Sequence, residues 1–574
     1  MVRKLFNGGD FLIKEVDCRD IFTPEDFTDE HKQIAATTEQ FVANEIRPIN
    51  EDIEGKNFDL VVEKLKECAA LGLMMIDAPV DYGGLELDKV ASMLVMEKMA
   101  FALNFGLTYM CHTGIGMLPL VYYGTADQKE RYLEKLIGAE MIGAYCLTEP
   151  GSGSDALGAK TTATLSEDGN YYILNGTKQF STNAGFADLY TVFAKVDKLH
   201  FTAFLVERTF SGLELGPEEK KMGLHGSSTR QVILDNVKVP VGNVLGEVGK
   251  GHKIAFNVLN VGRFKLGALC VGQKKYALSE GARYAAERKQ FKEPISSFGA
   301  IREKLADVSA MIFASEAVVY RLAGMIDDRL AILNRETADY YVQYQKGIEE
   351  YAAECALAKV FCTESAALAI DEMLQVHGGY GYIAEYPVEQ LYRDERVQRI
   401  YEGTNEINRL LIAGMCLRKQ VSAKGPDSAS EAAADGLFAA EKNLLKGMKR
   451  IYPELTDHIH HKFGAEAAGE QEIMLTLADA VIQIFALESA LLRAEKASAA
   501  ATERQQEFYR AVVGICAFRS KQQFVNAAIK YAAFLDDDIL LNLIETEITY
   551  PAKGLLEAKR LIAEATSQAG KYIF

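Results

Sequence analysis

The sequence lacks the cysteine and histidine patterns that mark disulfide frameworks and metal sites. Its nine cysteines are an odd number, lie scattered from Cys18 to Cys516, and include no Cys-x-x-Cys pair. We therefore expect reduced thiols. The one histidine cluster, from His458 to His461, has no nearby cysteine or third ligand at a metal-binding spacing, so we predict no metal site.

Positive charge and long apolar runs are also scarce. Lys and Arg number 63 against 80 Asp and Glu, which gives a formal net charge of −17. This argues against a general nucleic-acid binder, because such proteins need clustered basic residues to displace counterions from phosphates. We find no run of about 18 apolar residues and no signal or transit segment. We therefore expect a soluble, cytoplasmic protein, in which local basic sites for an anionic ligand remain open.

The periodicity of apolar residues divides the chain into segments of different character. At 574 residues it is too long for one core. A helical pattern over 1–143 gives way to alternation over 144–252, as in Leu189–Lys195, and returns over 253–420. Residues 421–436 have the composition of a flexible linker, and 437–574 are helical again. We predict a mainly α fold with an inserted antiparallel β domain.

The last helical segment contains a repeat of an earlier one. Aligning Leu305–Arg321 with Leu477–Arg493 at a constant offset matches Leu, Ala, Asp, Ile, Phe, Ala, Glu and Arg without a gap. We predict that the C-terminal domain is a degenerate copy of the helical bundle before it.

Glu402 is the candidate catalytic base. It follows Tyr401 and precedes a Gly-Thr pair that is typical of a helix start. A carboxylate between an aromatic ring and a glycine can be partly desolvated, which raises its pKa toward a value useful for proton transfer. The simpler alternative is an acidic residue favoured near a helix N-terminus.

A second candidate is the Gly/Ser-rich loop from Tyr145 to Asp155, which follows a predicted strand. Such a loop lets backbone N–H groups and hydroxyls approach a flat polar ring or a phosphate closely. An ordinary Pro-Gly turn is the alternative. The loop is not a dinucleotide-binding fingerprint, because no Gly-x-Gly-x-x-Gly opens a helix after a parallel strand.

Taken together, six motifs resemble those of the acyl-CoA dehydrogenase family in order and spacing, over about residues 30–415. The other five are Asn175–Asn183, Leu259–Arg263, Glu287–Phe291, Gln375–Gly379 and Tyr401–Thr404. The Leu-Asn-x-Gly-Arg form and the added C-terminal domain are most similar to the very-long-chain branch. The resemblance implies an N-terminal α domain, a middle β barrel and a C-terminal four-helix bundle, plus the extra helical domain.

The resemblance also implies FAD as the cofactor. Residues of the neighbouring subunit, Arg288 and the Gln375–Gly379 loop, would hold part of it. The implied cofactor residues are Tyr145, Leu147, Thr148, Gly153, Ser154, Phe180, Ser181, Thr182, Arg288, Phe291, Gln375, Val376, Gly378, Gly379, Thr404 and Glu406. The implied substrate residues are Ser154, Asn260, Arg263 and Gly403.

Family chemistry would make Glu402 remove the α-proton of a fatty acyl-CoA while the β-hydrogen leaves as hydride to the flavin. The product would be a trans-2-enoyl-CoA of fatty acid β-oxidation, and electron-transferring flavoprotein would reoxidise the flavin. Some relatives place the base immediately before the arginine that corresponds to Arg263. That position is Gly262 here, which leaves Glu402 as the candidate.

The sequence departs from the family pattern at two positions. Phe180 stands where many relatives have tryptophan, and this chain has no tryptophan at all, so aromatic packing survives but the indole donor is lost. Lys292 replaces the glycine that usually follows Arg-x-x-Phe, so the loop on the adenine side is expected to differ.

Several further expectations have alternatives. Gly106 and Met110 lie on the helix that would form the floor of the acyl pocket. A small and an apolar residue at these positions indicate a long acyl tunnel, and the alternative is that both residues only pack in the core. The extra domain favours a homodimer. One segment of the extra domain carries the basic residues Lys442, Lys446, Lys449 and Arg450. They predict either a basic amphipathic helix on a membrane surface or an ordinary packed helix. An acyl-CoA oxidase and an assembly factor that retains the fold are the rival functions.

Overall fold

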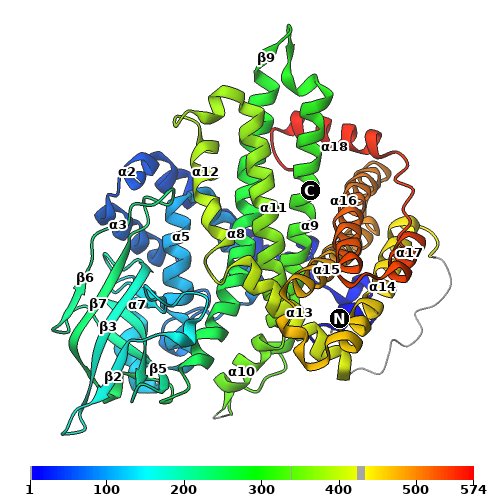
Figure 1. Cartoon of the computed structure of the whole chain (residues 1–574). Coiled ribbons are helices and arrows are strands. Elements are labelled where there is room, and N and C mark those ends of the chain that lie inside the picture. Colours follow the sequence, from blue (N-terminus) through cyan, green and yellow to red (C-terminus); the bar gives the residue numbers. More distant parts are fainter. Residues whose placement is uncertain (1–2, 338, 423–433) are drawn as a thin grey trace. The chain divides into compact units, whose positions relative to one another are not determined.

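The computed structural model describes residues 3–337, 339–422 and 434–574 (Figure 1). The chain forms two compact units. The first contains Met1–Phe27, Cys270–Ala331 and Glu350–Phe574, and the second contains Thr28–Leu269 and Ile332–Glu349. The predicted linker at 421–436 falls mostly on 423–433, outside the described residues. The predicted domain bounds remain a prediction.

The second unit begins with helices. Thr28 caps the first of them, because its side chain accepts a hydrogen bond from the His31 backbone N–H. A late segment of the chain adds one more helix to this unit, α10. The helices are α1 (Asp29–Phe41), α2 (Asn50–Glu54), α3 (Phe58–Ala70), α4 (Lys89–Met99), α5 (Asn104–Cys111), α6 (Leu118–Tyr123), α7 (Ala126–Ile137) and α10 (Tyr340–Glu349).

The same unit contains the predicted β domain. Its strands are β1 (Gly143–Cys146), β2 (Thr162–Leu165), β3 (Tyr171–Thr182), β4 (Leu189–Val196), β5 (His200–Glu207), β6 (Leu213–Leu215), β7 (Thr229–Pro240) and β8 (Val244–Leu245). They lie in the order β6-β7-β3-β2-β4-β5-β8, with β1 beside β4. Most pairs are antiparallel as predicted, but β1 and β2 both run parallel to β4. Tyr190, Val192 and Phe204 are fully buried in its core.

Among its described residues, the first unit has no strands other than those of a small hairpin; its other regular elements are helices. Helix α8 (Gly251–Glu287) belongs to this unit from Cys270 onward. The bundle continues with α9 (Gly299–Leu330), α11 (Ala352–His377), α12 (Pro387–Glu395) and α13 (Asn405–Ser422), and the hairpin is β9 (Lys289–Gln290) with β10 (Glu293–Pro294). The C-terminal helices are α14 (Ala439–Phe463), α15 (Gln471–Ser498), α16 (Glu503–Leu535), α17 (Asp538–Glu547) and α18 (Leu555–Ala569).

Three helices are long and apolar enough to cross a membrane by length and composition, although charged residues interrupt each of them, in agreement with the expected lack of an unbroken run of about 18 apolar residues. They are α8, α9 and α15, and 89%, 100% and 89% of their most apolar stretches are buried inside the fold. A helix that is apolar on all sides is typical of the core of a large helical protein.

The bundle and the C-terminal helices meet through paired contacts that the repeat relates to one another. Arg321 of α9 lies 2.8 Å from Glu488 of α15, and Arg493 of α15 lies 2.8 Å from Glu316 of α9. The alignment equates Glu316 with Glu488 and Arg321 with Arg493. The two ion pairs are therefore reciprocal, as in a contact between two copies of one surface.

We call the contact surface between the bundle helices and the C-terminal helices the seam. Other contacts across it are also related by the repeat. Each arginine also lies over a phenylalanine on its partner helix, Arg493 over Phe313 at 4.2 Å and Arg321 over Phe485 at 4.5 Å. The alignment equates those two rings as well. The C-terminal helices therefore cover the bundle with a surface that resembles the bundle's own.

Helix α14 packs its apolar face inside the first unit. Leu444, Met448 and Ile451 are fully buried. Its basic residues form ion pairs within the fold, including Lys442 with Glu495 at 2.6 Å. These contacts favour the packed-helix alternative over a membrane-surface helix.

Candidate functional site

A buried ion pair holds the Gly/Ser-rich loop after β1 against β3. Lys178 is fully buried, and its Nζ lies 2.7 Å from Glu149 Oε1 and donates to the Leu147 carbonyl at 3.3 Å. The Glu149 carboxylate also accepts from the Thr161 backbone N–H at 3.0 Å. Burial alone would raise the pKa of Glu149, but Lys178 outweighs it and the pKa is lowered. The pair therefore fixes the loop backbone.

Phe180 is presented outward at an irregularity of β3. The pairing of β3 with β7 shifts between Lys178 and Ser181, and Phe180 there has a left-handed φ of 56°. Its side chain is 61% exposed. The Gln179 N–H donates to the Thr148 carbonyl at 2.8 Å, which joins this segment to the loop. A bulge that redirects one side chain is common beside functional sites, and this ring is free to pack on a flat cofactor.

The other predicted cofactor residues of this unit occupy the same loop and strand. Gly153 is exposed, and a Cβ atom added there would meet nothing within 4 Å, so the loop is open at this point. Tyr145 and Ser181 are buried, Leu147, Thr148 and Thr182 are half-buried, and Ser154 is exposed.

The two predicted substrate residues on α8 contact each other. Arg263 Nη1 donates to Asn260 Oδ1 at 3.0 Å, and the two residues are buried, with 7% and 4% exposure. The amide therefore holds the guanidinium in a fixed orientation. Gly262 precedes Arg263 and offers no carboxylate.

In the first unit, Glu402 lies in a strained turn before α13. Its φ is +57°, and Gly403 follows with a φ of +81°. The left-handed conformation is unfavourable for a residue with a side chain, and such strain is typical of functional sites. Helix α13 begins at Asn405, and Thr404 Oγ1 accepts from the Ile407 N–H at 3.3 Å. The predicted helix start is confirmed.

Two residues that the sequence analysis missed hold this turn. Lys359 is fully buried in α11, and its Nζ donates to the Gly403 carbonyl at 2.9 Å and to Asn405 Oδ1 at 2.6 Å. Asn408 Nδ2 donates to the Gly403 carbonyl at 2.7 Å and to the Thr404 carbonyl at 3.0 Å. The sequence signal for Lys359 is a single charged residue in the apolar run 355–362. A buried lysine needs such acceptors.

Arg288 and the loop after α11 line a hollow with a volume of about 360 Å³. His377 stacks on Tyr284 with ring centroids 4.4 Å apart, and burial lowers the pKa of His377. Arg288 lies 5.4 Å from the Tyr380 ring. The hollow thus combines a cation, aromatic rings and glycine backbone. The predicted residues Val376, Gly378 and Gly379 line it, whereas Gln375, Phe291, Thr404 and Glu406 are not among its lining residues.

The hairpin beside this hollow shows why the departure at Lys292 is unfavourable for the backbone. Phe291 and Lys292 form its two-residue turn and have φ of +53° and +70°. Two left-handed residues define the turn type that favours Asn-Gly, so the glycine of relatives suits this position better than lysine. The Phe291 side chain is 88% exposed at the tip.

We expect Lys292→Gly to raise the thermal unfolding midpoint slightly. Relief of the left-handed strain should raise the free energy of unfolding by about 1–2 kcal/mol, whereas the greater flexibility of glycine in the unfolded chain should lower it by about 0.5–1 kcal/mol. Differential scanning fluorimetry should show a rise of about one degree. Lys292→Ala keeps the strain and should leave the midpoint unchanged, and a lower midpoint for the glycine variant would contradict this account.

Gly106 serves backbone packing. A Cβ atom at this position would lie 2.5 Å from the Met99 carbonyl oxygen, closer than real Cβ contacts allow. Met110 is also buried, with 4% exposure. The prediction that glycine here opens a longer tunnel is therefore not supported, and the packing alternative is favoured.

Comparison with known proteins agrees with this arrangement. Family models described as acyl-CoA dehydrogenase N-terminal, middle and C-terminal domains match residues 28–140, 144–237 and 249–417, and another C-terminal domain model matches 455–533. A probable acyl-CoA dehydrogenase of Bacillus subtilis is 43% identical over 98% of both chains. The human mitochondrial very long-chain specific acyl-CoA dehydrogenase is 34% identical over 82% of this chain and 76% of that protein.

A solved structure matches nearly the whole chain. The crystal structure of an acyl-CoA dehydrogenase complexed with FAD from Bacillus anthracis has a TM-score of 0.96 and 43% identity, and the match covers 99% of this chain and 100% of that one. The open loop at Gly153, the outward ring of Phe180 and the hollow at Arg288 fit such a cofactor. The chain belongs to the acyl-CoA dehydrogenase family and is an FAD-dependent enzyme of that family.

Proposed function

We propose that this enzyme converts long-chain fatty acyl-CoA to trans-2-enoyl-CoA in fatty acid β-oxidation. The observation that carries the proposal is the strained turn that holds Glu402, fixed by Lys359 and Asn408. The match to a very long-chain specific relative over 82% of this chain supports the long-chain preference.

In the proposed reaction, the Glu402 carboxylate removes the α-proton of the thioester. FAD, when bound, supplies the acceptor for the β-hydride. An α-proton is too weakly acidic for a carboxylate in water, so the developing enolate charge must be stabilised in a dry site. We infer that the Glu402 backbone N–H donates to the thioester carbonyl. The positive φ at Glu402 fixes how that N–H lies relative to the Glu402 side chain.

We further propose how the chain holds cofactor and substrate. The loop at Ser154 and the segment from Phe180 to Thr182 would pack on the flavin, and Thr404 and Glu406 would meet the cofactor at the start of α13, since helix N-termini suit phosphates. Arg288 and the Gln375–Gly379 loop would serve the FAD of a neighbouring subunit. This makes a homodimer the expected assembly. Arg263, held by Asn260, would contact the CoA portion.

Electron-transferring flavoprotein is the proposed electron acceptor and the cytoplasm the proposed location. The test is anaerobic titration of the FAD-loaded protein with acyl-CoAs of increasing chain length while flavin absorbance is followed. Bleaching that is most complete with long chains would support the proposal. No bleaching with any chain would overturn the dehydrogenase function and favour an assembly factor. Sustained turnover with oxygen as sole acceptor would identify an acyl-CoA oxidase.

Lys359→Met should lower kcat with little change in KM. The variant removes the cation that bonds Gly403 and Asn405, so the turn no longer holds the Glu402 carboxylate in place. A misplacement of about 1 Å can cost about 100-fold in rate. Steady-state kinetics with a long-chain acyl-CoA would measure the effect.

Lys274→Met is the matched control for that variant. Lys274 is also fully buried, but its Nζ bonds the hydroxyl of Ser365, 2.7 Å away, rather than the turn. It should lower stability while largely keeping kcat. Equal kcat for Lys359→Met and the parent enzyme would show that Lys359 does not position Glu402.

A further inference from the structure

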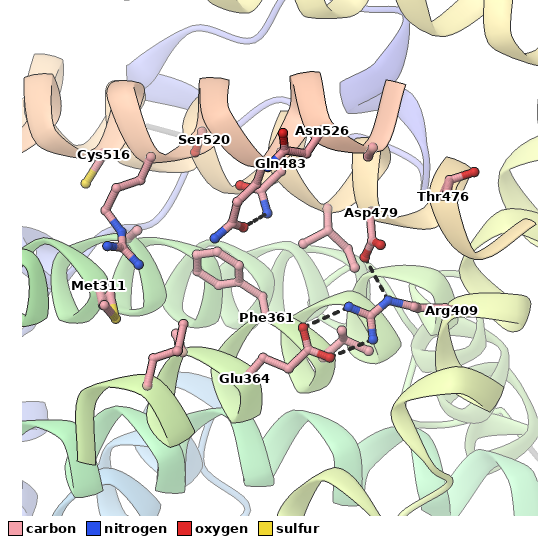
Figure 2. A pocket seen from close by; sticks show the side chains of 18 of the residues that line it. Met311, Phe361, Glu364, Arg409, Thr476, Asp479, Gln483, Cys516, Ser520 and Asn526 are labelled. Carbon is pink, nitrogen blue, oxygen red and sulfur yellow. Dashed lines mark hydrogen bonds and ion pairs between the residues drawn. The ribbon is translucent and has the colours of Figure 1, made fainter. Parts of the chain in front are cut away.

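A pocket lies along the seam between the bundle helices α9 and α11 and the C-terminal helices α15 and α16 (Figure 2). Its volume is about 350 Å³, within the range of small-molecule sites. None of the residues assigned above to FAD or acyl-CoA is among the described residues that line it. The pocket is therefore a separate feature of the first unit.

The walls of the pocket are mainly apolar. Met311 comes from α9, Phe361 and Leu368 come from α11, and Ile482 comes from α15. Leu368 is 50% exposed, which marks the side where the pocket opens to solvent. Figure 2 shows the Phe361 ring lying between the facing sets of helices. Such walls suit an aliphatic chain.

The charges at one end of the pocket satisfy one another. Arg409 donates to both oxygens of Glu364, at 2.6 and 2.8 Å, and to Asp479 at 2.7 Å, as the dashed lines in Figure 2 show. This guanidinium is occupied by two carboxylates and has little capacity left for a ligand.

Arg519 of α16 has guanidinium N–H donors that are available to a ligand. Its Nη1 lies 4.0 Å from Asp307 Oδ2, which is an ion pair beyond hydrogen-bond distance. Asp307 has a closer partner in Lys559, at 3.1 Å. Within the described ranges, the Arg519 guanidinium makes no hydrogen bond to the protein. A planar guanidinium with free donors beside an apolar wall is suited to a carboxylate.

A second cation of the lining, Lys530, makes no ion pair with any described residue; its Nζ lies 5.4 Å from the centroid of the Phe534 ring, and its charge acts on the nearby Asp479 carboxylate. Counting Arg409, Arg519 and Lys530 against Glu364 and Asp479, the lining carries a net positive charge. The chain as a whole is strongly negative. This contrast favours an anionic ligand.

We propose that the seam pocket binds a medium-chain fatty acid anion, with its carboxylate on Arg519 and its chain along Met311, Phe361 and Ile482. The volume equals that of about a dozen water molecules, which is close to the size of a ten-carbon fatty acid. A ligand here contacts both α9/α11 and α15/α16 and so stabilises the seam. The proposal does not depend on the dehydrogenase reaction.

The test is isothermal titration of the FAD-loaded full chain with decanoate. We expect saturable binding at one site and a rise in the thermal midpoint. Arg519→Gln should weaken binding by about ten-fold or more, the effect of losing a charge-assisted hydrogen bond. Decanol, which lacks the charge, and acetate, which lacks the chain, should each bind far more weakly.

Two controls separate this site from others. Lys521→Gln changes a cation on the same helix that does not line the pocket, and should bind decanoate as the parent does. Glu402→Gln should also bind it unchanged. No saturable binding, or equal binding by Arg519→Gln and the parent, would overturn the proposal. Loss of decanoate binding in Glu402→Gln without any loss in Arg519→Gln would assign decanoate to the acyl-CoA site and would also overturn the proposal.

Discussion

Glu402→Gln is expected to lower kcat by about 1,000-fold, in the range that a positioned general base contributes. The amide keeps the size and hydrogen-bonding reach of the side chain but cannot accept the α-proton. The turn is fastened through main-chain carbonyls at Gly403 and Thr404, so it should survive the change. Steady-state turnover with a long-chain acyl-CoA, measured at equal FAD content, tests this.

Three companion variants define what Glu402 contributes. Glu402→Asp keeps a carboxylate on a shorter arm and should retain more activity than the amide. Glu385→Gln changes an exposed carboxylate outside the site and should behave as the parent. Glu402→Gly should be inactive yet at least as stable as the parent, because glycine adopts a φ of +57° without strain. A lower stability for this last variant would contradict the strain at Glu402.

Arg493→Met is expected to reduce the free energy of unfolding of the first unit by about 3–5 kcal/mol. Removing one partner of a buried ion pair leaves the other charge uncompensated. Arg493 is 1% exposed and bonds Glu316 at 2.8 Å and Glu25 at 2.9 Å. Its repeat-related counterpart Arg321 is 2% exposed, and Arg321→Met should have a similar effect. Chemical denaturation monitored by helical circular dichroism measures both.

A double-mutant cycle separates the ion pair from lost packing. If Arg493 and Glu316 interact directly, the combined variant Arg493→Met/Glu316→Gln should cost less than the sum of the two single changes. Additive costs would mean that the seam depends on packing and not on the reciprocal pairs.

The pH dependence of stability gives a second check on this pair. Burial by itself raises the pKa of Glu316, but Lys275 and Arg493 outweigh it, so the pKa is lowered on folding. The contribution of Glu316 to stability is therefore fully present at pH values above the ordinary pKa of a glutamate. It is lost as the pH falls toward the lowered pKa of the folded state. Arg493→Met should lose less stability than the parent on acidification.

Local patterns in the sequence predicted the β domain and the helix start after Glu402. Alternation over 144–252 matches strands from Gly143 to Leu245, and α13 begins at Asn405. The parallel pairing of β1 and β2 with β4 could not be predicted, because alternation fixes which face a residue occupies and not which strand lies beside it.

Tertiary contacts account for what the sequence analysis missed. Lys359 looked like an isolated charge in an apolar helix, and only the approach of the turn before α13 gives it acceptors. Gly106 looked like space for an acyl chain, but a side chain there would collide with the Met99 carbonyl oxygen, 2.5 Å from the Cβ position. At Lys292 the departure from the family pattern was visible, whereas its left-handed φ of +70° was not.

Anaerobic single-turnover mixing with a long-chain acyl-CoA tests most directly whether Glu402 is the base. Without an electron acceptor, flavin bleaching reports the reaction of the substrate separately from the later reoxidation of the flavin. Parent enzyme and Glu402→Gln, loaded equally with FAD, are mixed with substrate and flavin absorbance is recorded. We predict rapid bleaching in the parent and at least a 1,000-fold slower rate, or none, in the variant. Bleaching at the parent rate in Glu402→Gln would show that another group removes the proton.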